Sequence, residues 1–572
     1  MLYSGMRGVL DFFGQRHSGR ARIVVSAVLL TIATFLIVEG GLAPRVRTDA
    51  PPPVPLTGNP IVAENKKAGT TSWRIDHITG GALQGFASRT SVPPNGHITL
   101  FVTSAYPTYS VDVYRMGWYH GTGARLVYAR HGLTGLVQPD ATTDGETRMV
   151  EAHWSPSLTL TVADDWTTGT YIAKLSGPQG QGSYIPFVVR EGRERAPIVF
   201  QSSVTTWQAY NIWGGHSLYF GIESGGGEAA SLRSKVVSFD RPYGYGSGAA
   251  DYFGLEFPLV QWLEENGYNV GYATDLDTHE DPLLLTGRRA FLSLGHDEYW
   301  STAMRDHVEA AVKQGVNLAF FGANAMYRHI RFESSPLGLD RREINYRSTS
   351  DPITEVDPKE ATVQWRDYPI ERPEDAVMGA MYECNPVHGD SIVYDPLTWL
   401  FTGTRLTTDD RVKGIVGDEY DRVFPDTTHP KRLWVLFRSP VDCGNATSVQ
   451  DTTFARFPSG AGVFDAGTSR FLCVFSGCPT APRDERMQRL VRNLIDSYLA
   501  PTPPRPEPDP RAFTTFTRHV VVQYESSTTV RSPAIMPLPT PEPPATPSWT
   551  QPPMPTPGPE TPAPTPRHLG IP

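Results

Sequence analysis

Between residues 67 and 192, short apolar runs alternate with turn residues at regular intervals. Each run has the two-residue period of a strand, and Gly, Pro or Asn residues separate one run from the next. Six strands are predicted, at residues 98–102, 109–115, 125–128, 158–162, 171–175 and 184–189. Many short strands without a helical period are typical of two packed sheets. The pattern therefore predicts an immunoglobulin-like β-sandwich over residues 67–192.

The period changes after residue 193, where strands and helices begin to alternate. Strands are predicted at 198–200, 269–273, 290–294 and 316–321, and helices at 259–265, 301–314 and 487–499. The second of these helices carries Met304 and Val308 on one face, and Ser301 or Thr302 can cap its start. Such alternation is typical of a parallel sheet covered by helices on both faces. Residues 193–500 are therefore expected to form a doubly wound, flavodoxin-like α/β domain.

A continuous apolar run near the start of the chain follows three arginines. With its flanking residues the run reaches about 20 residues, the length that spans a bilayer. Pro44 directly after it makes a poor cleavage position, so an uncleaved signal anchor is expected. The predicted segments are a cytoplasmic basic segment at 1–22, a transmembrane signal anchor at 23–42 and a Pro-rich linker at 43–66. Everything after the anchor is then extracytoplasmic, at the cell surface.

Length and charge narrow the class of protein further. A chain of 572 residues exceeds what one hydrophobic core serves, so two or more domains are expected. A net charge of -9, without a basic stripe, argues against nucleic acid as a partner. The segment 501–572 holds 22 of the 52 prolines and is predicted to be disordered or extended. Neither the oligomeric state nor a role for this tail follows from the sequence.

The four cysteines all lie in the part that is expected to be exported. An even number there favours two disulfides, although spacing alone leaves three connectivities open. The local choice pairs Cys473 with Cys478 and Cys384 with Cys443. A zinc site is the alternative, but no CxxC pair and no nearby His spacing supports it.

Candidate chemistry gathers after two of the predicted strands. The strand 290–294 is followed by His296, Asp297 and Glu298, and the strand 198–200 is followed by a loop that contains Tyr210 and Tyr219. Parallel strands a few units apart end at the same edge of the sheet, so these side chains are expected to converge. Carboxylates, phenols and an imidazole in one crevice can hold a catalytic metal. The alternative for each tyrosine is a wall residue whose hydroxyl is hydrogen-bonded at the rim.

Five blocks, in the same order, resemble the C-terminal domain of the N,N-dimethylformamidase large-subunit family over about residues 196–500. The blocks are Thr206-Trp-Gln-Ala-Tyr-Asn211, Gly214-Gly-x-Ser-Leu-Tyr219, the segment 233–242 that ends Ser-Phe-Asp-Arg-Pro, Trp262-Leu-Glu264 and Gly295-His-Asp-Glu-Tyr-Trp300. The resemblance implies a class I glutamine amidotransferase-like fold and hydrolysis of a C–N (amide) bond. It also implies ferric iron (Fe³⁺) held by Tyr210, Tyr219 and Glu298. His296 would then be the proton shuttle to the leaving amine.

The resemblance leaves several assignments open. Tyr252 or Tyr243 could replace Tyr219 as the second tyrosine ligand, and Asp297 stands where the family pattern has a proline. The turn at 322–326 looks like a nucleophile elbow with Asn324 in place of a Cys, which disfavours an acyl-enzyme mechanism.

Asn324 and Asn211 are candidate contacts to a small amide-like substrate, whose identity the sequence does not supply. Asp275 and Asp277 could add carboxylates to the same crevice, although turn and capping duty is favoured. The rival function is a non-catalytic cell-surface binding module with a vestigial site, which would hold a surface glycan or peptide.

Overall fold

The computed structural model describes residues 58–424, 427–444, 446–501 and 507–511. By its contacts the chain divides into two units, Met1–Val54 and Pro55–Pro572. The predicted cytoplasmic segment, the signal anchor and the tail from residue 512 onward all lie outside the described residues. Within the described part of the chain, no helix is long and apolar enough to span a membrane.

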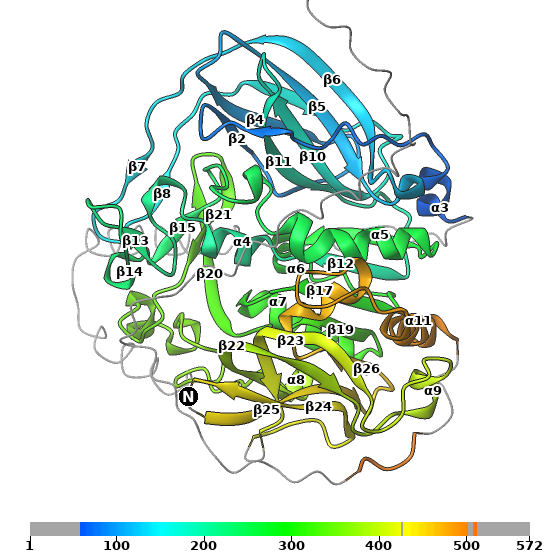
Figure 1. The fold of residues 1–572 in the computed structure, drawn as a ribbon. Coiled ribbons are helices and arrows are strands. Elements are labelled where there is room, and N and C mark those ends of the chain that lie inside the picture. Colours follow the sequence, from blue (N-terminus) through cyan, green and yellow to red (C-terminus); the bar gives the residue numbers. More distant parts are fainter. Residues whose placement is uncertain (1–57, 425–426, 445, 502–506, 512–572) are drawn as a thin grey trace, which may run out of the picture. The chain divides into compact units, whose positions relative to one another are not determined.

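Two sheets pack against each other in the segment that the sequence predicts as a sandwich, drawn in blue to cyan in Figure 1. One sheet has the order β1-β11-β10-β5-β6, with β3 paired to β11, and the other has the order β2-β4-β9. The strands are β1 (His77–Ile78), β2 (Leu83–Ala87), β3 (Ser91–Val92), β4 (His97–Ser104), β5 (Thr108–Met116), β6 (Ala124–Thr134), β9 (Leu158–Thr161), β10 (Gly169–Ser176) and β11 (Gln181–Val189). Leu83 and Leu100 of one sheet share a buried core with Val111, Tyr171 and Ile185 of the other. All six predicted strands are present, and the immunoglobulin-like classification stays a prediction.

The end of the predicted linker forms a helix instead of an extended spacer. Helix α3 (Pro60–Asn65) begins after Asn59, whose side-chain oxygen accepts a hydrogen bond from the Ile61 N–H. Ile61 is fully buried, and Glu64 forms an ion pair with Arg125 at 2.5 Å. A proline in the first turn is compatible with a helix, because that turn needs no N–H donor from it. Residues 60–65 are therefore part of the folded chain, and the predicted linker boundary at residue 66 is too late.

A seven-stranded sheet organises the rest of the chain, in the order β16-β12-β17-β19-β26-β25-β24. Its strands are β12 (Ile198–Ser202), β16 (Val270–Thr274), β17 (Ala290–Gly295), β19 (Asn317–Gly322), β24 (Leu433–Cys443), β25 (Ala446–Arg456) and β26 (Gly462–Asp465). The first five strands in the order are parallel, and β25 and β24 are antiparallel additions. The carboxyl ends of β12, β17 and β19 therefore lie next to one another, as predicted.

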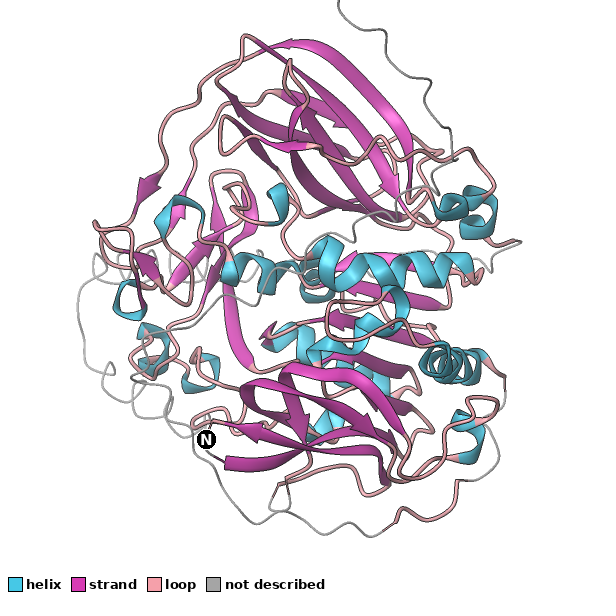
Figure 2. Ribbon diagram, in the orientation of Figure 1, coloured by secondary structure: helices cyan, strands magenta, loops and turns pink. Residues whose placement is uncertain are grey.

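Alternate residues of the parallel strands enter two different cores. Phe200 and Leu292 join the core that includes α5 (Phe257–Glu265) and α11 (Glu485–Leu499), whereas Phe291 joins the core that includes α7 (Thr302–Lys313). This alternation follows from the two-residue period of a strand that is buried on both faces. Helices thus cover both faces of the sheet (Figure 2).

The predicted cap of α7 is confirmed, because the Ser301 side chain accepts a hydrogen bond from the Met304 N–H at 3.2 Å. The flavodoxin-like and amidotransferase-like classification, and the predicted domain boundary at residue 193, stay predictions.

The sequence pattern did not predict the smaller sheets that surround the carboxyl edge. A four-stranded sheet has the order β15-β21-β20-β18, and β22 pairs with β23 in a long antiparallel arm. Their bounds are β15 (Val236–Ser238), β18 (Tyr299–Ser301), β20 (Arg328–Ser335), β21 (Gly338–Ile344), β22 (Met381–Ile392) and β23 (Arg411–Arg422). The remaining strands and α-helices of the described residues are β7 (Thr142–Thr143), β8 (Val150–Glu151), β13 (Gly221–Ile222), β14 (Glu228–Ala229), α4 (Val204–Tyr210), α6 (Asp275–Glu280), α8 (Asp375–Met378), α9 (Thr398–Phe401) and α10 (Cys473–Ser476). A π-helical turn lies at Tyr252–Glu256.

Both disulfides join the cysteines that are close in sequence. Cys384 on β22 is bonded to Cys443 on β24, and Cys473 is bonded to Cys478. The local pairing predicted from the sequence is therefore confirmed.

A short piece of the predicted tail also packs on this part of the chain. Glu507 forms an ion pair with Arg456, and the Pro508 carbonyl oxygen accepts a hydrogen bond from Trp434 Nε1 at 3.2 Å. Residues 507 and 508 are therefore held against β24 and β25.

Candidate metal centre

Two tyrosines reach the carboxyl edge of the sheet from the chain that follows β12. Helix α4 ends at Tyr210, and the Leu218 N–H donates to the Ala209 carbonyl oxygen at 2.9 Å. This backbone bond places Tyr219 beside Tyr210, and the two rings stack with 4.2 Å between their centroids. Ser217 closes the turn, because its Oγ accepts a hydrogen bond from the Tyr219 N–H at 3.2 Å.

The third residue, Glu298, lies in the loop after β17, and that strand ends at Gly295. Gly295 has a φ of +64°, in the left-handed region that favours glycine. A Cβ on Gly322, at the end of β19, would lie 1.5 Å from the Gly295 carbonyl oxygen, so both glycines are needed for this close passage. The Glu298 N–H donates to Thr206 Oγ1 at 2.9 Å. This bond ties the loop to α4, the helix that carries the first tyrosine.

The three predicted oxygen donors meet at one point. The hydroxyls of Tyr210 and Tyr219 donate to the same carboxylate oxygen, Glu298 Oε2, at 2.9 and 2.5 Å. Glu298 is 1% exposed, whereas both tyrosines are only partly buried, so the centre borders solvent on the tyrosine side.

The alternative tyrosines lie elsewhere. Tyr243 and Tyr252 pack around Trp207, with ring centroids 6.1 and 6.5 Å from its ring. Neither donates a hydrogen bond to Glu298 within the described residues. The structure therefore brings Tyr219, rather than Tyr243 or Tyr252, to the carboxylate.

Charged neighbours set the protonation of this centre. Burial raises the pKa of Glu298, but the hydrogen bond from His296 and the charges of His296, Arg328 and Arg347 outweigh it and lower the pKa to about 2. Burial, followed by the charge of Glu298, raises the pKa of both tyrosines well above the ordinary value. The Arg347 guanidinium lies 4.0 Å from the centroid of the Tyr219 ring. An ionised carboxylate thus faces two neutral phenols that donate to it.

His296 lies between two carboxylates, and the sequence predicted only one of them. Its Nε2 is 2.9 Å from Glu419 Oε2 and 3.3 Å from Glu298 Oε2. Burial lowers the pKa of His296, but the charges and hydrogen bonds of Glu419 and Glu298 raise it well above the ordinary value. An imidazolium that is held between two buried carboxylates can give a proton to a group bound beside it.

Glu419 arrives on β23, far from the sequence blocks of the other site residues. Its Oε1 accepts a hydrogen bond from Asn385 Nδ2 at 3.1 Å. Asn385 follows Cys384, so the disulfide to Cys443 anchors the strand that orients Glu419. The one signal in the sequence is the cluster 418–421, which places three acidic residues in a run that is otherwise suited to a buried strand.

Asn324 lies where a nucleophile elbow would place its nucleophile, but the elbow is incomplete. Its φ is +59°, and its N–H donates to Asp421 Oδ1 at 2.9 Å. The turn leads into β20 rather than into a helix. One end of the Asn324 side-chain amide lies 3.3 Å from His296 Nε2, and because an imidazolium N–H donates, the amide oxygen is the end that can accept from it. The substrate contact predicted for Asn324 stays a prediction.

Asn211 is fully occupied within the protein. Its Nδ2 donates to Gln208 and to the Pro242 carbonyl oxygen, and its Oδ1 accepts from the N–H groups of Trp213 and Gly244. Two donors and two acceptor positions are all that the amide offers. The substrate contact predicted for Asn211 therefore finds no support in the structure.

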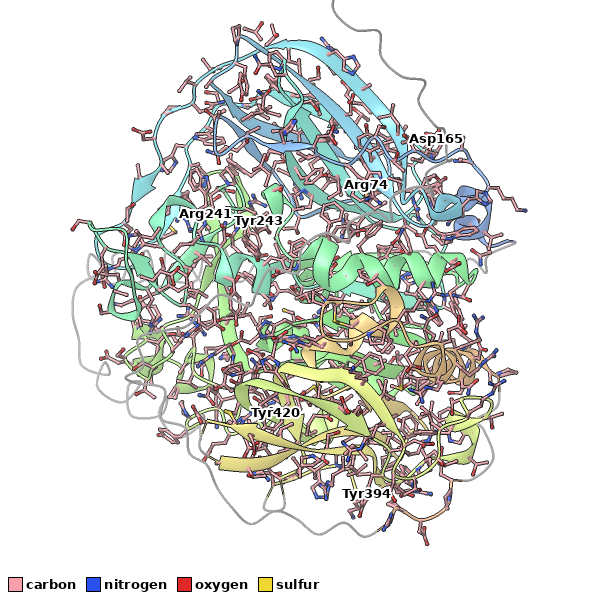
Figure 3. All side chains as sticks on the ribbon, in the orientation of Figure 1. Arg74, Asp165, Arg241, Tyr243, Tyr394 and Tyr420 are labelled. Carbon is pink, nitrogen blue, oxygen red and sulfur yellow. A yellow bond between two sulfur atoms is a disulfide. The ribbon has the colours of Figure 1, made fainter. Side chains whose placement is uncertain are left out.

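The segment that follows this loop carries Arg241 and Tyr243, which Figure 3 labels close together. The guanidinium of buried Arg241 donates to Gln208 Oε1 and to the backbone carbonyl oxygens of Asn211, Trp213 and His216. These bonds fix the loop in place.

The neighbouring aspartates act structurally. Asp297 accepts hydrogen bonds from Ser293, Gln201 and Trp300, which gives the residue that departs from the family pattern a role in fixing the loop. Asp275 accepts from Thr205, and Asp277 forms a capping box with Thr274. The capping role favoured from the sequence is therefore observed for Asp277, whereas Asp275 joins α6 to α4.

The donor set fits the ion that the resemblance implies. Ferric iron is a hard cation that suits anionic oxygen donors. Adjacent oxygens around a small octahedral cation, with bonds of about 2.0 Å, lie about 2.8 Å apart. The Tyr210 and Tyr219 oxygens lie 2.9 and 2.5 Å from Glu298 Oε2. Within the described ranges no three His, Cys, Asp or Glu residues are grouped so that they could hold a metal ion, and two of the three donors at this centre are tyrosines.

Comparison with known proteins agrees with the sequence blocks. The family described as N,N-dimethylformamidase beta subunit-like, C-terminal, matches residues 110–483. Proteins named N,N-dimethylformamidase beta subunit from Paracoccus aminophilus and from an Alcaligenes species are each 23% identical to this chain over 213 residues. These alignments cover 31% of this chain and 28% of each relative, so the chain matches less than a third of their length. Because the family match spans more than half of the sequence and includes the whole candidate centre, this chain belongs to the N,N-dimethylformamidase beta subunit-like, C-terminal family.

Proposed function

We propose that this protein hydrolyses the C–N bond of a small amide, with ferric iron held by Tyr210, Tyr219 and Glu298. The observation that carries the proposal is the meeting of two phenolic oxygens on one buried carboxylate oxygen, with the imidazole of His296 3.3 Å from the same oxygen. When bound, such an ion would polarise an amide carbonyl as a Lewis acid and would lower the pKa of a water molecule. Phenols with a strongly raised pKa would lose their protons only against a strong positive charge, which suits a trivalent ion.

The residues around the donors have separate tasks. His296, which is already protonated, is placed to give its proton to the leaving amine nitrogen, so that the free amine rather than an amide anion departs. Glu419 lies 2.9 Å from His296 Nε2 and is placed to accept a proton from water and then to pass it to the neutral imidazole. The Asn324 amide lies beside His296, and its other polar end can form a hydrogen bond with the amide group of a substrate and so orient it.

We also propose that the enzyme works outside the cytoplasm, attached to the membrane by its N-terminal segment. The two disulfides of the folded part support this location, because disulfides persist in oxidising compartments. The proposed partner is a small amide-like substrate, and the acidic net charge supports the exclusion of nucleic acid.

Metal content and amine release together test the proposal on the purified full chain. We expect close to one iron per chain, a visible phenolate-to-iron absorption band and amine release from a panel of small amides. Glu298→Gln should lose both iron and activity. The matched control Glu333→Gln, on an exposed strand position, should lose neither.

Two further variants separate metal binding from turnover. Tyr219→Phe should lose or shift the visible band, whereas Tyr368→Phe, whose ring is 73% exposed, should not. Glu419→Gln should keep the iron and lose about 100-fold in turnover. A colourless, iron-free protein that releases no amine would refute the proposal. If that protein still bound a surface glycan or peptide, the non-catalytic module would replace it.

A further inference from the structure

A cavity of about 540 Å³ lies away from the candidate metal centre. Its walls come from residues 88–91 of the sandwich, from helix α6, and from the turn between β20 and β21 together with the start of β21. No donor, carboxylate or imidazole of the metal centre lines it. A cavity of this size is in the range that holds a small organic ligand, roughly 300–1,000 Å³.

Internal bonds fix the walls of this cavity. Asp277 accepts a hydrogen bond from Ser91 Oγ at 2.6 Å and pairs with Arg190 at 2.9 Å. Arg341 is buried and pairs with Asp240 at 2.7 Å. These charges are therefore neutralised within the protein, and they hold the sandwich segment, α6 and the β20–β21 turn in place. The cavity is a preformed feature of three packed elements.

Three charged side chains of the cavity lining take no part in these internal bonds. Arg89, Glu280 and Asp340 form no side-chain hydrogen bond or ion pair with any residue that the structure describes. Arg89 and Glu280 are exposed, and Asp340 is half-buried. One guanidinium and two carboxylates thus border the same space without reaching one another. A ligand that carries both signs of charge could satisfy them together.

The rest of the lining includes an apolar patch at the mouth. Leu339 is 76% exposed and Leu337 is 37% exposed, whereas Leu276 is buried in the wall. Two exposed leucines, Leu337 in the turn and Leu339 on β21, offer apolar surface beside the cavity that an aliphatic group can cover.

We infer that this cavity binds a small aliphatic zwitterion, of which a free amino acid such as leucine is the simplest example. The ligand carboxylate pairs with Arg89, its ammonium group lies between Glu280 and Asp340, and its side chain covers Leu337 and Leu339. The charges of Arg89, Glu280 and Asp340 select this class, because neither a purely anionic nor a purely cationic ligand satisfies all three groups. The inference does not rest on the proposed amide hydrolysis.

Calorimetric titration of the purified full chain with L-leucine tests the inference. Leucine should bind saturably at one site per chain. Leucinamide, which lacks the carboxylate, and 4-methylpentanoate, which lacks the ammonium group, should each bind about five- to tenfold more weakly.

Variants assign each charge to one end of the ligand. Arg89→Met should weaken leucine about five- to tenfold and leave leucinamide unchanged, whereas Asp340→Asn should weaken leucine and leave 4-methylpentanoate unchanged. Arg193→Met and Asp140→Asn remove exposed charges elsewhere and should change nothing. The inference is overturned if leucine gives no saturable binding, or if Arg89→Met and Asp340→Asn bind it as the unmodified protein does.

Discussion

The buried ion pair between Arg115 on β5 and Glu264 on α5 joins the sandwich to the helix layer, and removal of one partner should destabilise the whole folded unit. Arg115 donates to the two Glu264 oxygens at 2.7 and 3.1 Å, and both side chains are fully buried. Tyr272 and Asn65 add hydrogen bonds to the same carboxylate at 2.8 and 2.9 Å. Glu264→Gln leaves a buried guanidinium without a counter-charge, for which the expected cost is about 3–5 kcal/mol of unfolding free energy.

Urea unfolding followed by tryptophan fluorescence measures this cost. Arg115→Met should cost a similar amount, and the double variant should be less destabilised than the sum of the two singles. We expect a coupling energy of at least about 1.5 kcal/mol between the two positions. The exposed control Glu333→Gln should stay within about 0.5 kcal/mol of the unmodified protein. A coupling energy near zero, or a single-variant cost below about 1 kcal/mol, would refute the view that this pair holds the two layers together.

Three further outcomes are expected. Burial raises the pKa of Glu256 from 4.5 to about 8, so its protonated form favours folding and this contribution is lost as pH rises from 4.5 to about 8. Above pH 8, Glu256→Gln should therefore be more stable than the unmodified protein by on the order of 4 kcal/mol of unfolding free energy, measured in urea titrations. If the variant and the unmodified protein were equally stable both at pH 4.5 and above pH 8, the assignment would be contradicted. Replacing Cys384 and Cys443 by Ser should cost about 4 kcal/mol of unfolding free energy, because the bond closes a loop with a separation of 59 residues; an unchanged urea midpoint would show that the loop is already constrained. Gly322→Ala should lower the melting temperature and the iron content together, whereas Gly145→Ala, with open space around it, should change neither in a thermal scan.

The parts of the fold that the sequence predicted are those where periodicity reports burial directly. The strands β17 and β19 are short apolar runs, and α7 combines an apolar face with a capping serine, so pattern and structure agree there. Helix α3 was missed because it is only six residues long and follows a Pro-rich stretch that is typical of a spacer. Its burial depends on contacts with Arg125 and Glu264, which are distant in sequence.

The candidate site was predicted to the extent that its residues lie in contiguous motifs. Tyr210, Tyr219 and Glu298 belong to blocks with a recognisable order, and the structure brings their oxygens together. Glu419 was missed because it lies in no such block and its strand shows no regular alternation. Asn211 was expected to face a substrate, but loop closure around Arg241 uses all of its hydrogen bonds. Whether the hydrogen-bonding groups of a side chain are all used within the protein depends on tertiary contacts, which a local sequence pattern does not show.

The arm formed by β22 and β23 contributes Glu419 but none of the three oxygen donors. In the proposed enzyme, holding the ion and moving the proton are thus encoded in separate stretches of the gene. Substitutions in the arm can change the proton-transfer step, or the range of substrates that are hydrolysed, while the three residues that hold the ion stay the same. Family members that share the tyrosine pair need not share a substrate, and their differences should be sought first in this arm.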